Sequence, residues 1–163
     1  PNTPGLRELQ EKDALLKIFS VLQNINQGKK KPKPMLLKIA PDLTDKQFDD
    51  IVLLTKETGL SGLVATNTTT GRENLLTPPQ KIEKTGAGGL SGKPIQSRTT
   101  HVLKYLSDAL GGTIPLIAAG GIFTGEDAKE KLEAGASLLQ VWTGFVYEGP
   151  AIVKNICKAL AEK

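Results

Sequence analysis

Four short apolar runs, each followed by residues suited to binding a ligand, constrain the fold of this chain most. The runs are residues 35–40, 62–65, 115–119 and 137–141. They continue into Pro41-Asp42, residues 66–69, Gly120-Gly121 and residues 142–144, respectively. An apolar run without alternating polar residues predicts a strand of a parallel sheet that is covered on both faces. Because ligand sites gather at the carboxyl ends of parallel strands, we expect the residues after the runs to share one edge.

The composition is that of an ordinary globular domain and excludes several kinds of protein. With 163 residues, 39% of them hydrophobic, the chain is predicted to form a soluble, cytoplasmic domain around one core. No stretch approaches the roughly 18 apolar residues that cross a bilayer. The single cysteine, Cys157, cannot form an internal disulfide. The densest basic run, at 29–33, has no interleaved aromatic residues, so we expect a solvated loop and no nucleic-acid partner.

Helical patterns with start and stop signals separate the apolar runs. The helix after the first run is predicted to begin with a capping box formed by Thr44 and Gln47 and to end at Gly59. Further helices are expected at about residues 9–23, around His101 up to Gly111, at 124–135 and at 152–160. This alternation of strands and helices predicts a parallel sheet with right-handed crossovers.

Two folds have this pattern, a doubly wound sheet and a (β/α)8 barrel. The first helix lacks the Gly-x-Gly-x-x-Gly opening of dinucleotide-binding sheets. The pairs Gly120-Gly121 and Thr143-Gly144 match the phosphate site that barrels build after their seventh and eighth strands. A barrel has eight strands, and the chain has runs for about four of them. We therefore expect residues 1–163 to form an α/β domain, the C-terminal half of a TIM barrel with parallel strands and flanking helices.

Two polar side chains stand out near the strand ends. Lys38 lies within an apolar run, where burial of an unpaired ammonium would be costly. It is expected either to reach an anion or an electron-rich ring of a ligand, or to extend into solvent or pair with Asp42. Asn67 carries two donors and an acceptor, which fit the edge of a cyclic imide or ureide, although a simple turn would also explain it.

Two glycine-rich segments, at 88–92 and 119–121, allow the backbone to approach a ligand closely. Their N–H groups can bind an anion, although either segment alone is also explained as a turn. The sequence shows no cluster of metal ligands and no pairing of a nucleophile with a base. His101 is expected on a helix surface and Cys157 in packing.

Five segments together resemble the C-terminal half of the dihydroorotate dehydrogenase family, most closely its class 2, quinone-using and membrane-associated branch. They are residues 1–7 (PNTPGLR), 37–42 (LKIAPD), 66–69 (TNTT), 88–92 (GGLSG) and 119–122 (AGGI). The segments occur in the family's order and span nearly the whole chain, so their combination is specific. The resemblance implies an FMN enzyme of pyrimidine biosynthesis that oxidises dihydroorotate to orotate and passes the electrons through the flavin to a quinone.

The resemblance also implies roles for individual residues. The residues that would bind FMN are Lys38, Thr66, Gly92, Gly121, Trp142 and Thr143. Those that would bind dihydroorotate or orotate are Asn2, Asn67 and Thr68. Lys38 would lie against the flavin ring and stabilise its anionic reduced form, whereas the last three FMN residues would hold the phosphate. Trp142 departs from the tyrosine usual in the family, but an indole can also flank a phosphate.

Other parts of the family pattern are expected to lie outside this chain. In class 2 members a serine base directly precedes the Pro-Asn-Thr motif, which begins here at Pro1. The first barrel strands and the helices that contact the membrane and the quinone would also precede it. A general base typically contributes about 10²–10⁴-fold to the rate, so we expect this fragment to be inactive by itself. A half-barrel exposes strand edges and an apolar inner face, which predicts self-association or pairing with the missing half.

Three alternatives stay open at this point. The chain could be a flavin-free half-barrel that binds a sugar phosphate through Gly121 and Thr143. It could be a self-assembling half-barrel without a ligand. It could also derive from a class 1 enzyme, in which the base is a cysteine.

Overall fold

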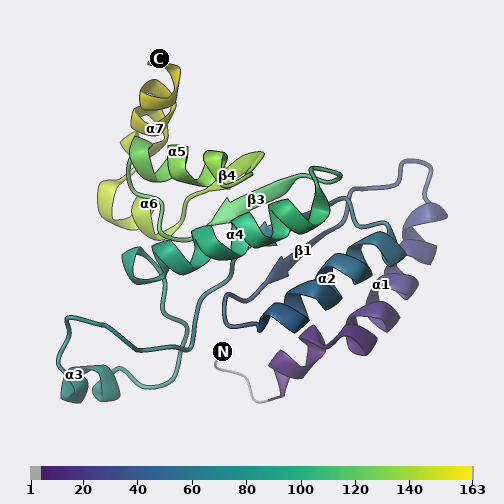
Figure 1. Ribbon diagram of the computed structural model, residues 1–163, viewed down its shortest axis with the longest axis horizontal. Helices are drawn as coiled ribbons and strands as arrows, with labels where there is room; N and C mark the ends of the chain where they lie inside the picture. The colour runs from purple at the N-terminus through teal and green to yellow at the C-terminus, as the bar shows by residue number, and fades with distance from the viewer. Residues whose placement is uncertain (1–4, 163) are drawn as a thin grey trace.

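The chain forms a four-stranded parallel sheet with helices packed against it (Figure 1). A computed structural model describes residues 5–162. The strands, in both spatial and chain order, are β1 (Leu36–Ile39), β2 (Gly62–Ala65), β3 (Leu116–Ala119) and β4 (Leu138–Gln140). The helices are η1 (Leu6–Gln10), α1 (Lys12–Gln27), α2 (Asp45–Thr58), α3 (Pro79–Lys84), η2 (Lys93–Ile95), α4 (Gln96–Leu110), α5 (Gly125–Glu133), α6 (Thr143–Glu148) and α7 (Ala151–Ala161). The expected α/β architecture, four parallel strands with flanking helices, is confirmed.

The two faces of the sheet differ in burial. Residues aligned across neighbouring strands form rows on the sheet. One such row, Leu37, Leu63 and Leu116, is buried in the hydrophobic core. The next row, on the opposite face, contains Lys38, Val64, Ile117 and Leu138. Both ends of this second row are exposed, and Leu138 is 60% accessible to solvent. The expectation that every strand is covered on both faces was therefore wrong for β1 and β4, because each is an outer strand whose second face meets solvent.

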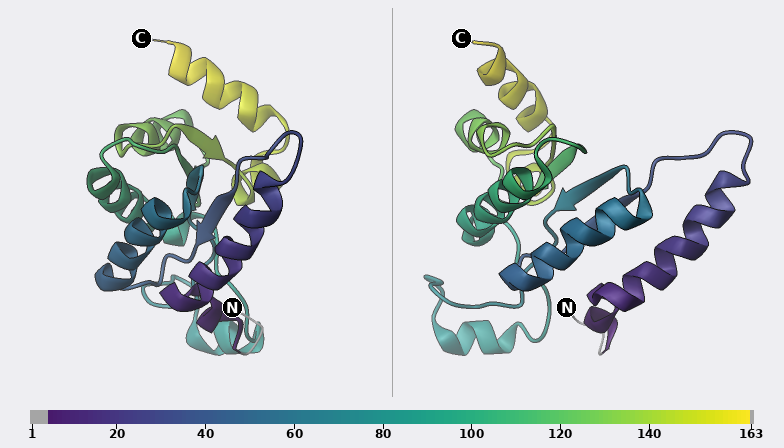
Figure 2. Two further views of the ribbon diagram at one scale, coloured as in Figure 1. Left: turned by 90° about the vertical axis from the view of Figure 1, so that its right-hand side faces the viewer. Right: turned by 45° about the vertical axis from the view of Figure 1, so that its right-hand side comes forward.

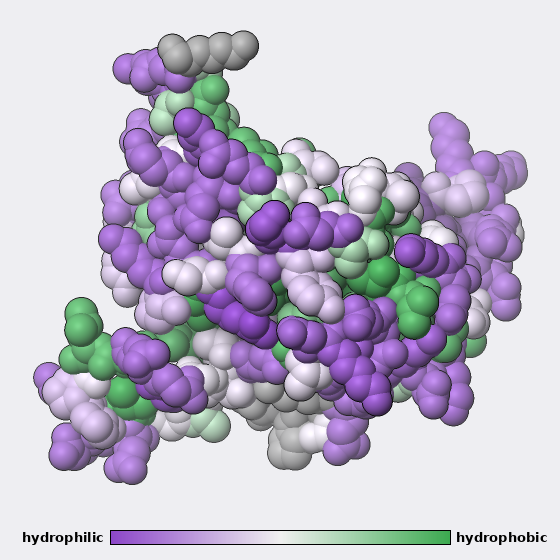
Figure 3. All heavy atoms as spheres, viewed as in Figure 1, coloured by the Kyte–Doolittle hydropathy of each residue, from purple (hydrophilic) through white to green (hydrophobic). Residues whose placement is uncertain are grey.

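The helices supply the other half of the core. Their most deeply buried side chains include Phe48 of α2, Val102 and Leu106 of α4, Ala128 of α5 and Ile152 of α7. Burying an aliphatic or aromatic side chain of this size contributes about 1.5–3 kcal/mol, so this interface accounts for much of the stability. Figure 2 shows α1 and α7 at opposite ends of the helical layer. The face that carries α4 and α5 is mainly hydrophilic, as expected for the outside of a barrel (Figure 3).

The predicted side-chain caps are present at the starts of α2 and α5. The Thr44 hydroxyl accepts a hydrogen bond from the backbone nitrogen of Gln47 at 3.3 Å. In return, the side-chain oxygen of Gln47 accepts one from the backbone nitrogen of Thr44 at 3.0 Å. Thr124 and Asp127 form the same reciprocal pair at the start of α5. Gly59 ends α2 in the left-handed conformation, where glycine is favoured because it has no Cβ. These local signals therefore set where α2 and α5 begin and where α2 ends, whereas α1, α4 and α7 begin without a side-chain cap.

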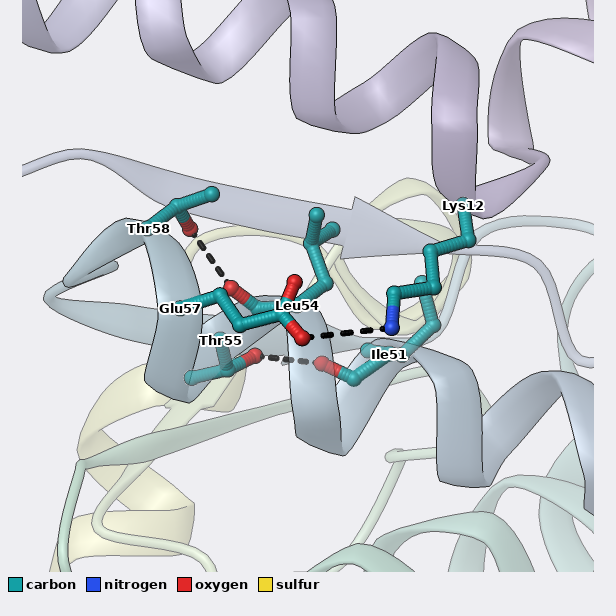
Figure 4. Close-up of polar contacts among 6 residues, drawn as sticks. All are labelled: Lys12, Ile51, Leu54, Thr55, Glu57 and Thr58. Atoms are coloured by element: carbon teal, nitrogen blue, oxygen red, sulfur yellow. Dashed lines mark hydrogen bonds and ion pairs between the residues drawn. The ribbon is translucent and has the colours of Figure 1, made fainter.

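Polar contacts join α1 to α2 and satisfy hydroxyl groups within α2 (Figure 4). The Lys12 ammonium lies 3.2 Å from a carboxylate oxygen of Glu57. The hydroxyls of Thr55 and Thr58 donate to the carbonyl oxygens of Ile51 and Leu54, one turn earlier, each at 2.7 Å. A partly exposed ion pair of this kind contributes at most about 1 kcal/mol, so the packing of Leu15 and Phe19 carries most of the association of α1 with the core.

The short helix α3 lies on an excursion that projects from the body of the molecule (Figures 1 and 2). An antiparallel bridge between Thr69 and Leu90 closes the base of this excursion. Arg72 fastens it further, since its guanidinium donates to the carbonyl oxygens of Thr69, Gly71 and Gly88. Within residues 5–162, no helix combines the length and the apolar character needed to cross a bilayer.

Candidate functional site

A cavity of about 400 Å³ opens toward the carboxyl ends of the strands. The predicted site residues that line it are Lys38, Thr66, Asn67, Thr68, Gly121, Trp142 and Thr143. Gly92 does not line the cavity. It is buried and follows Ser91, which does line it. Asn2 lies outside the described residues. The structure thus brings residues from all four strand ends to one place, as the sequence pattern predicted.

Lys38 reaches the cavity from β1 on the less buried face of the sheet. Its side chain is exposed, because it alternates with the buried Leu37 and Ile39 along the strand. Lys38 is therefore not a buried ammonium in the four-stranded sheet and needs no anion to offset desolvation. Lys38 remains a cation at the cavity wall, placed there by the period of two residues along a strand.

The segment after β2 continues the sheet for two more residues through its backbone. The Thr66 nitrogen donates to the Ala119 carbonyl at 2.8 Å, and the Asn67 nitrogen donates to the Ile39 carbonyl at 2.7 Å. The first bond reaches toward β3 and the second toward β1, so both neighbouring strand ends hold this segment. The exposed Asn67 side chain consequently starts from a fixed backbone at the cavity wall.

The turn after β3 must be made of glycine. Gly120 and Gly121 have φ angles of 113° and 73°, which side chains with a Cβ rarely adopt. A Cβ on Gly121 would lie 2.5 Å from the Cα of Gln96, and a Cβ on Gly120 would lie 2.9 Å from Cγ2 of Thr99. The start of α4 therefore packs directly against this turn, which leaves the opposite side of the turn to the cavity.

The connection from β4 to α6 forms another wall. The Thr143 hydroxyl donates a hydrogen bond of 2.9 Å to the Ser91 hydroxyl. A Cβ on Gly92 would lie 3.0 Å from Cγ2 of Thr143, so the absence of a side chain at Gly92 permits this contact. Trp142 lines the same wall but is 81% exposed. Its indole is therefore available to a ligand or to a further part of the protein.

Some residues of the cavity were not predicted from the sequence. Ser91 and Gln140 are polar, and Ile95 contributes an apolar side chain. Gln140 carried a signal similar to that of Lys38, since it is a polar residue within an apolar run. The sequence marks Ser91 only as part of a glycine-rich segment, because its contact with Thr143 spans 52 residues of sequence.

The chemistry of the lining favours an anionic ligand. Lys38 provides a positive charge, and no aspartate or glutamate of the described chain lines the cavity. The hydroxyls and the Asn67 amide provide neutral hydrogen-bonding groups, and the glycine turn leaves backbone N–H groups close to the cavity. In residues 5–162 no group of three or more His, Cys, Asp or Glu side chains is placed to hold a metal ion. The site is therefore suited to an organic ligand with a phosphate or carboxylate group.

Comparison with known proteins agrees with this geometry. The family model described as dihydroorotate dehydrogenase matches residues 1–163. Proteins named dihydroorotate dehydrogenase (quinone) from Christiangramia forsetii and from a Synechocystis species are 53% and 52% identical to the chain and align with all of it. The chain spans less than half of these relatives, 47% and 43% of their lengths.

Solved structures give the same result. The crystal structure of DHODH from Eimeria tenella in complex with ferulenol superposes with a TM-score of 0.89 at 36% sequence identity. The match covers 98% of this chain and 46% of that one, as expected for half of a barrel. Ligand-free DHODH from the same organism superposes equally well, with 37% identity. The chain therefore belongs to the dihydroorotate dehydrogenase family.

Proposed function

We propose that this chain supplies one half of the flavin site of a dihydroorotate dehydrogenase and serves the oxidation of dihydroorotate to orotate in pyrimidine biosynthesis. The observation that carries the proposal is the cavity at which Lys38, Asn67, Gly121 and Thr143 meet from four strand ends. The names of the relatives specify a quinone, which supports a quinone as the final electron acceptor.

The residues present fit FMN as the cofactor. A lining without carboxylates suits a phosphate, and Gly121, Trp142 and Thr143 would hold it. Lys38 would lie near the flavin ring, where its ammonium would stabilise negative charge. Thr66 and the backbone of Gly92 would complete the contacts with the cofactor. FMN, when bound, supplies hydride acceptance and onward electron transfer, which amino-acid side chains cannot provide.

The substrate is proposed to lie beside the ring-binding end of the cavity. Asn67 would donate to and accept from the amide edges of dihydroorotate or orotate, and Thr68 would add a hydroxyl. Asn2 would contribute from the segment outside the described residues. These residues would orient the substrate, because several hydrogen bonds to its amide edge fix a ring more tightly than a single hydrogen bond does.

We infer that the chain does not turn over dihydroorotate by itself. The described cavity is walled by the ends of β1–β4 and the segments that follow them, and the outer strands leave Lys38 and Leu138 exposed. A site open to water on one side cannot orient and desolvate the reactants as catalysis requires. Further strands, from a second copy or from the other half of a barrel, would close it.

Flavin titration tests the proposal. FMN added to the purified chain is expected to lose fluorescence and shift its absorbance, and Lys38→Met is expected to reduce the shift while largely retaining binding. A site for sugar phosphates that does not contact the flavin ring would instead bind ribose 5-phosphate with an affinity similar to that for FMN. The flavin spectrum would then stay unchanged. A ligand-free half-barrel would bind neither. Either result would overturn the proposed flavin site.

Pairing of the open sheet is tested by hydrodynamics. The outer strand β4 and the helix α6 expose Leu138, Phe145, Val146 and Tyr147, with 47–77% of each side chain accessible. Large exposed apolar side chains on an outer strand and the helix that follows it favour association. We expect sedimentation at micromolar concentration to show dimers, and Leu138→Glu to shift them toward monomer. A wild-type chain that sediments as a stable monomer would contradict the proposed pairing.

A further inference from the structure

Lys131 of α5 is fully buried, with 0% of its surface accessible to solvent. Lysine is almost never buried without partners, because desolvation of an ammonium is costly. Its Nζ donates to the Gln96 carbonyl at 2.8 Å, to the Thr99 hydroxyl at 2.9 Å and to the Thr100 hydroxyl. All three donors of the ammonium are therefore used, and all three acceptors lie in the first turns of α4.

The same turns of α4 form the back of the glycine turn in the cavity. Thr99, which accepts from Lys131, places its hydroxyl 3.1 Å from the Gly120 carbonyl. The same hydroxyl lies 2.9 Å from the Gln96 carbonyl, a second acceptor that also receives a bond from Lys131. The Thr99 hydroxyl is therefore shared between the Gln96 and Gly120 carbonyls, and through its contact with Gly120 it connects Lys131 to the turn.

The position of the Gly120 carbonyl decides where the next N–H points. The peptide between Gly120 and Gly121 is trans, and a trans peptide directs its C=O and N–H to opposite sides. Because the carbonyl faces Thr99 on α4, the Gly121 N–H faces away from α4. Gly121 lines the cavity on that side, so its N–H is presented to a ligand there.

Nearby carboxylates do not neutralise the ammonium directly. Asp127 and Glu130 accept from the side-chain amide of Gln96, at 2.7 and 3.2 Å. Asp127 also accepts from the backbone nitrogens of Phe123 and Thr124. Among the described side chains, no carboxylate lies within ion-pair distance of Lys131. Hydrogen bonds to α4 therefore hold the ammonium in place of an ion pair, although Glu130 and Asp127 lie close enough to interact with its charge.

We propose that Lys131 is a positioning residue for phosphate binding: through Thr99 it holds the Gly120–Gly121 peptide with its N–H toward the phosphate group of a flavin nucleotide. This inference rests on the proposed flavin site and deepens it. It assigns a ligand-directed role to a side chain that does not touch the ligand. A lysine that only joined α4 to α5 would stabilise the fold without distinguishing a phosphorylated ligand from its dephosphorylated form.

The test compares FMN with riboflavin, which lacks the phosphate, by titrating flavin fluorescence. Lys131→Met is expected to lower the ratio of FMN affinity to riboflavin affinity by about tenfold, the effect of losing one charge-assisted hydrogen-bond chain. The matched control is Lys129→Met on the same helix, whose side chain is 71% exposed and pairs with Glu133. It is expected to leave the ratio unchanged.

A folded Lys131→Met protein with the wild-type ratio would overturn the role of Lys131. If this variant does not fold, the same affinity ratio is measured in Thr99→Val. This change removes the hydroxyl that contacts Gly120 but leaves the bonds of Lys131 to Gln96 and Thr100. An unchanged ratio in Thr99→Val would also overturn the proposal. Wild-type protein that binds neither FMN nor inorganic phosphate would show instead that the proposed flavin site is wrong.

Discussion

Thr143 and Ser91 join two distant connections of the barrel half through a hydroxyl–hydroxyl hydrogen bond of 2.9 Å. Thr143 begins α6 after β4, whereas Ser91 precedes η2 and α4. The bond therefore closes the cavity between the second and fourth strand–helix units. Its geometry depends on Gly92, since a side chain there would press on the Thr143 methyl group.

Replacement of Thr143 by valine is expected to open this wall. Valine keeps the shape of threonine but cannot donate to Ser91, so we expect the free energy of unfolding to fall by about 1 kcal/mol. FMN affinity should fall with it, because Thr143 lines the proposed phosphate end. Urea denaturation and flavin titration measure the two effects. Thr143→Ser, which keeps the hydroxyl, is the control, and equal losses in both variants would contradict the importance of the bond.

The glycine turn offers a sharper comparison between two substitutions. Gly121 and Gly86 both have a φ of 73°, but a Cβ on Gly121 would lie 2.5 Å from Gln96 whereas a Cβ on Gly86 would meet nothing within 4 Å. Each change to alanine introduces the left-handed strain of about 1–2 kcal/mol. Only Gly121→Ala adds overpacking, which costs about 1–3 kcal/mol more. Thermal or urea unfolding measures the difference, and equal destabilisation would contradict the close packing of α4 on the turn.

The parts of the fold that follow from local chemistry could be predicted from the sequence. The reciprocal bonds of Thr44 with Gln47 need only residues three positions apart, and the left-handed glycines at helix ends need only a missing Cβ. The parallel arrangement of the strands followed from the alternation of strands and helices. The convergence of Asn67 and Gly121 on one cavity was predicted because parallel strands end at a shared edge.

Other features depend on contacts between distant residues and could not be predicted in this way. The short helices α3 and α6 contain six residues each, too few for a helical period to stand out. The exposure of Lys38 follows from the open second face of the sheet, which an apolar run alone does not reveal. Lys131 did carry a signal, since it lies three residues after the buried Ala128 and therefore on the buried stripe of α5.

Arg98 of α4 is expected to hold the loop that leaves β1. Its Nε donates to the Pro41 carbonyl and its Nη2 to the Leu43 carbonyl, each at 2.9 Å, and its guanidinium lies 5.6 Å from the centre of the Phe48 ring. Lysine cannot reproduce two divergent bonds together with stacking. Arg98→Lys should therefore lower the free energy of unfolding by about 1–2 kcal/mol in urea denaturation.

The control for Arg98 is Lys104→Met on the same helix. Lys104 is exposed and pairs with Asp108 at 3.4 Å, so its loss should change stability by less than about 0.5 kcal/mol. An Arg98→Lys protein as stable as the wild type would contradict the proposed clamp on the loop.

The stability contributed by Lys131 is expected to change with pH. Desolvation lowers the pKa of Lys131 below its ordinary value of 10.5, although Glu130 and Asp127 oppose the shift. The groups that face it from α4, Gln96, Thr99 and Thr100, are uncharged. Between the lowered pKa and 10.5 the unfolded chain binds more protons than the folded chain. The free energy of unfolding therefore rises with pH across this window.

Urea denaturation of wild type and Lys131→Met from pH 7 to pH 10.5 measures this dependence. The stability of wild type minus that of the variant should increase as the pH rises, because the cost of keeping a buried ammonium charged is relieved. The same difference for Lys129→Met should stay flat, since that side chain is largely exposed. A wild-type advantage over Lys131→Met that falls as the pH rises would mean that the folded protein stabilises the charged form of Lys131.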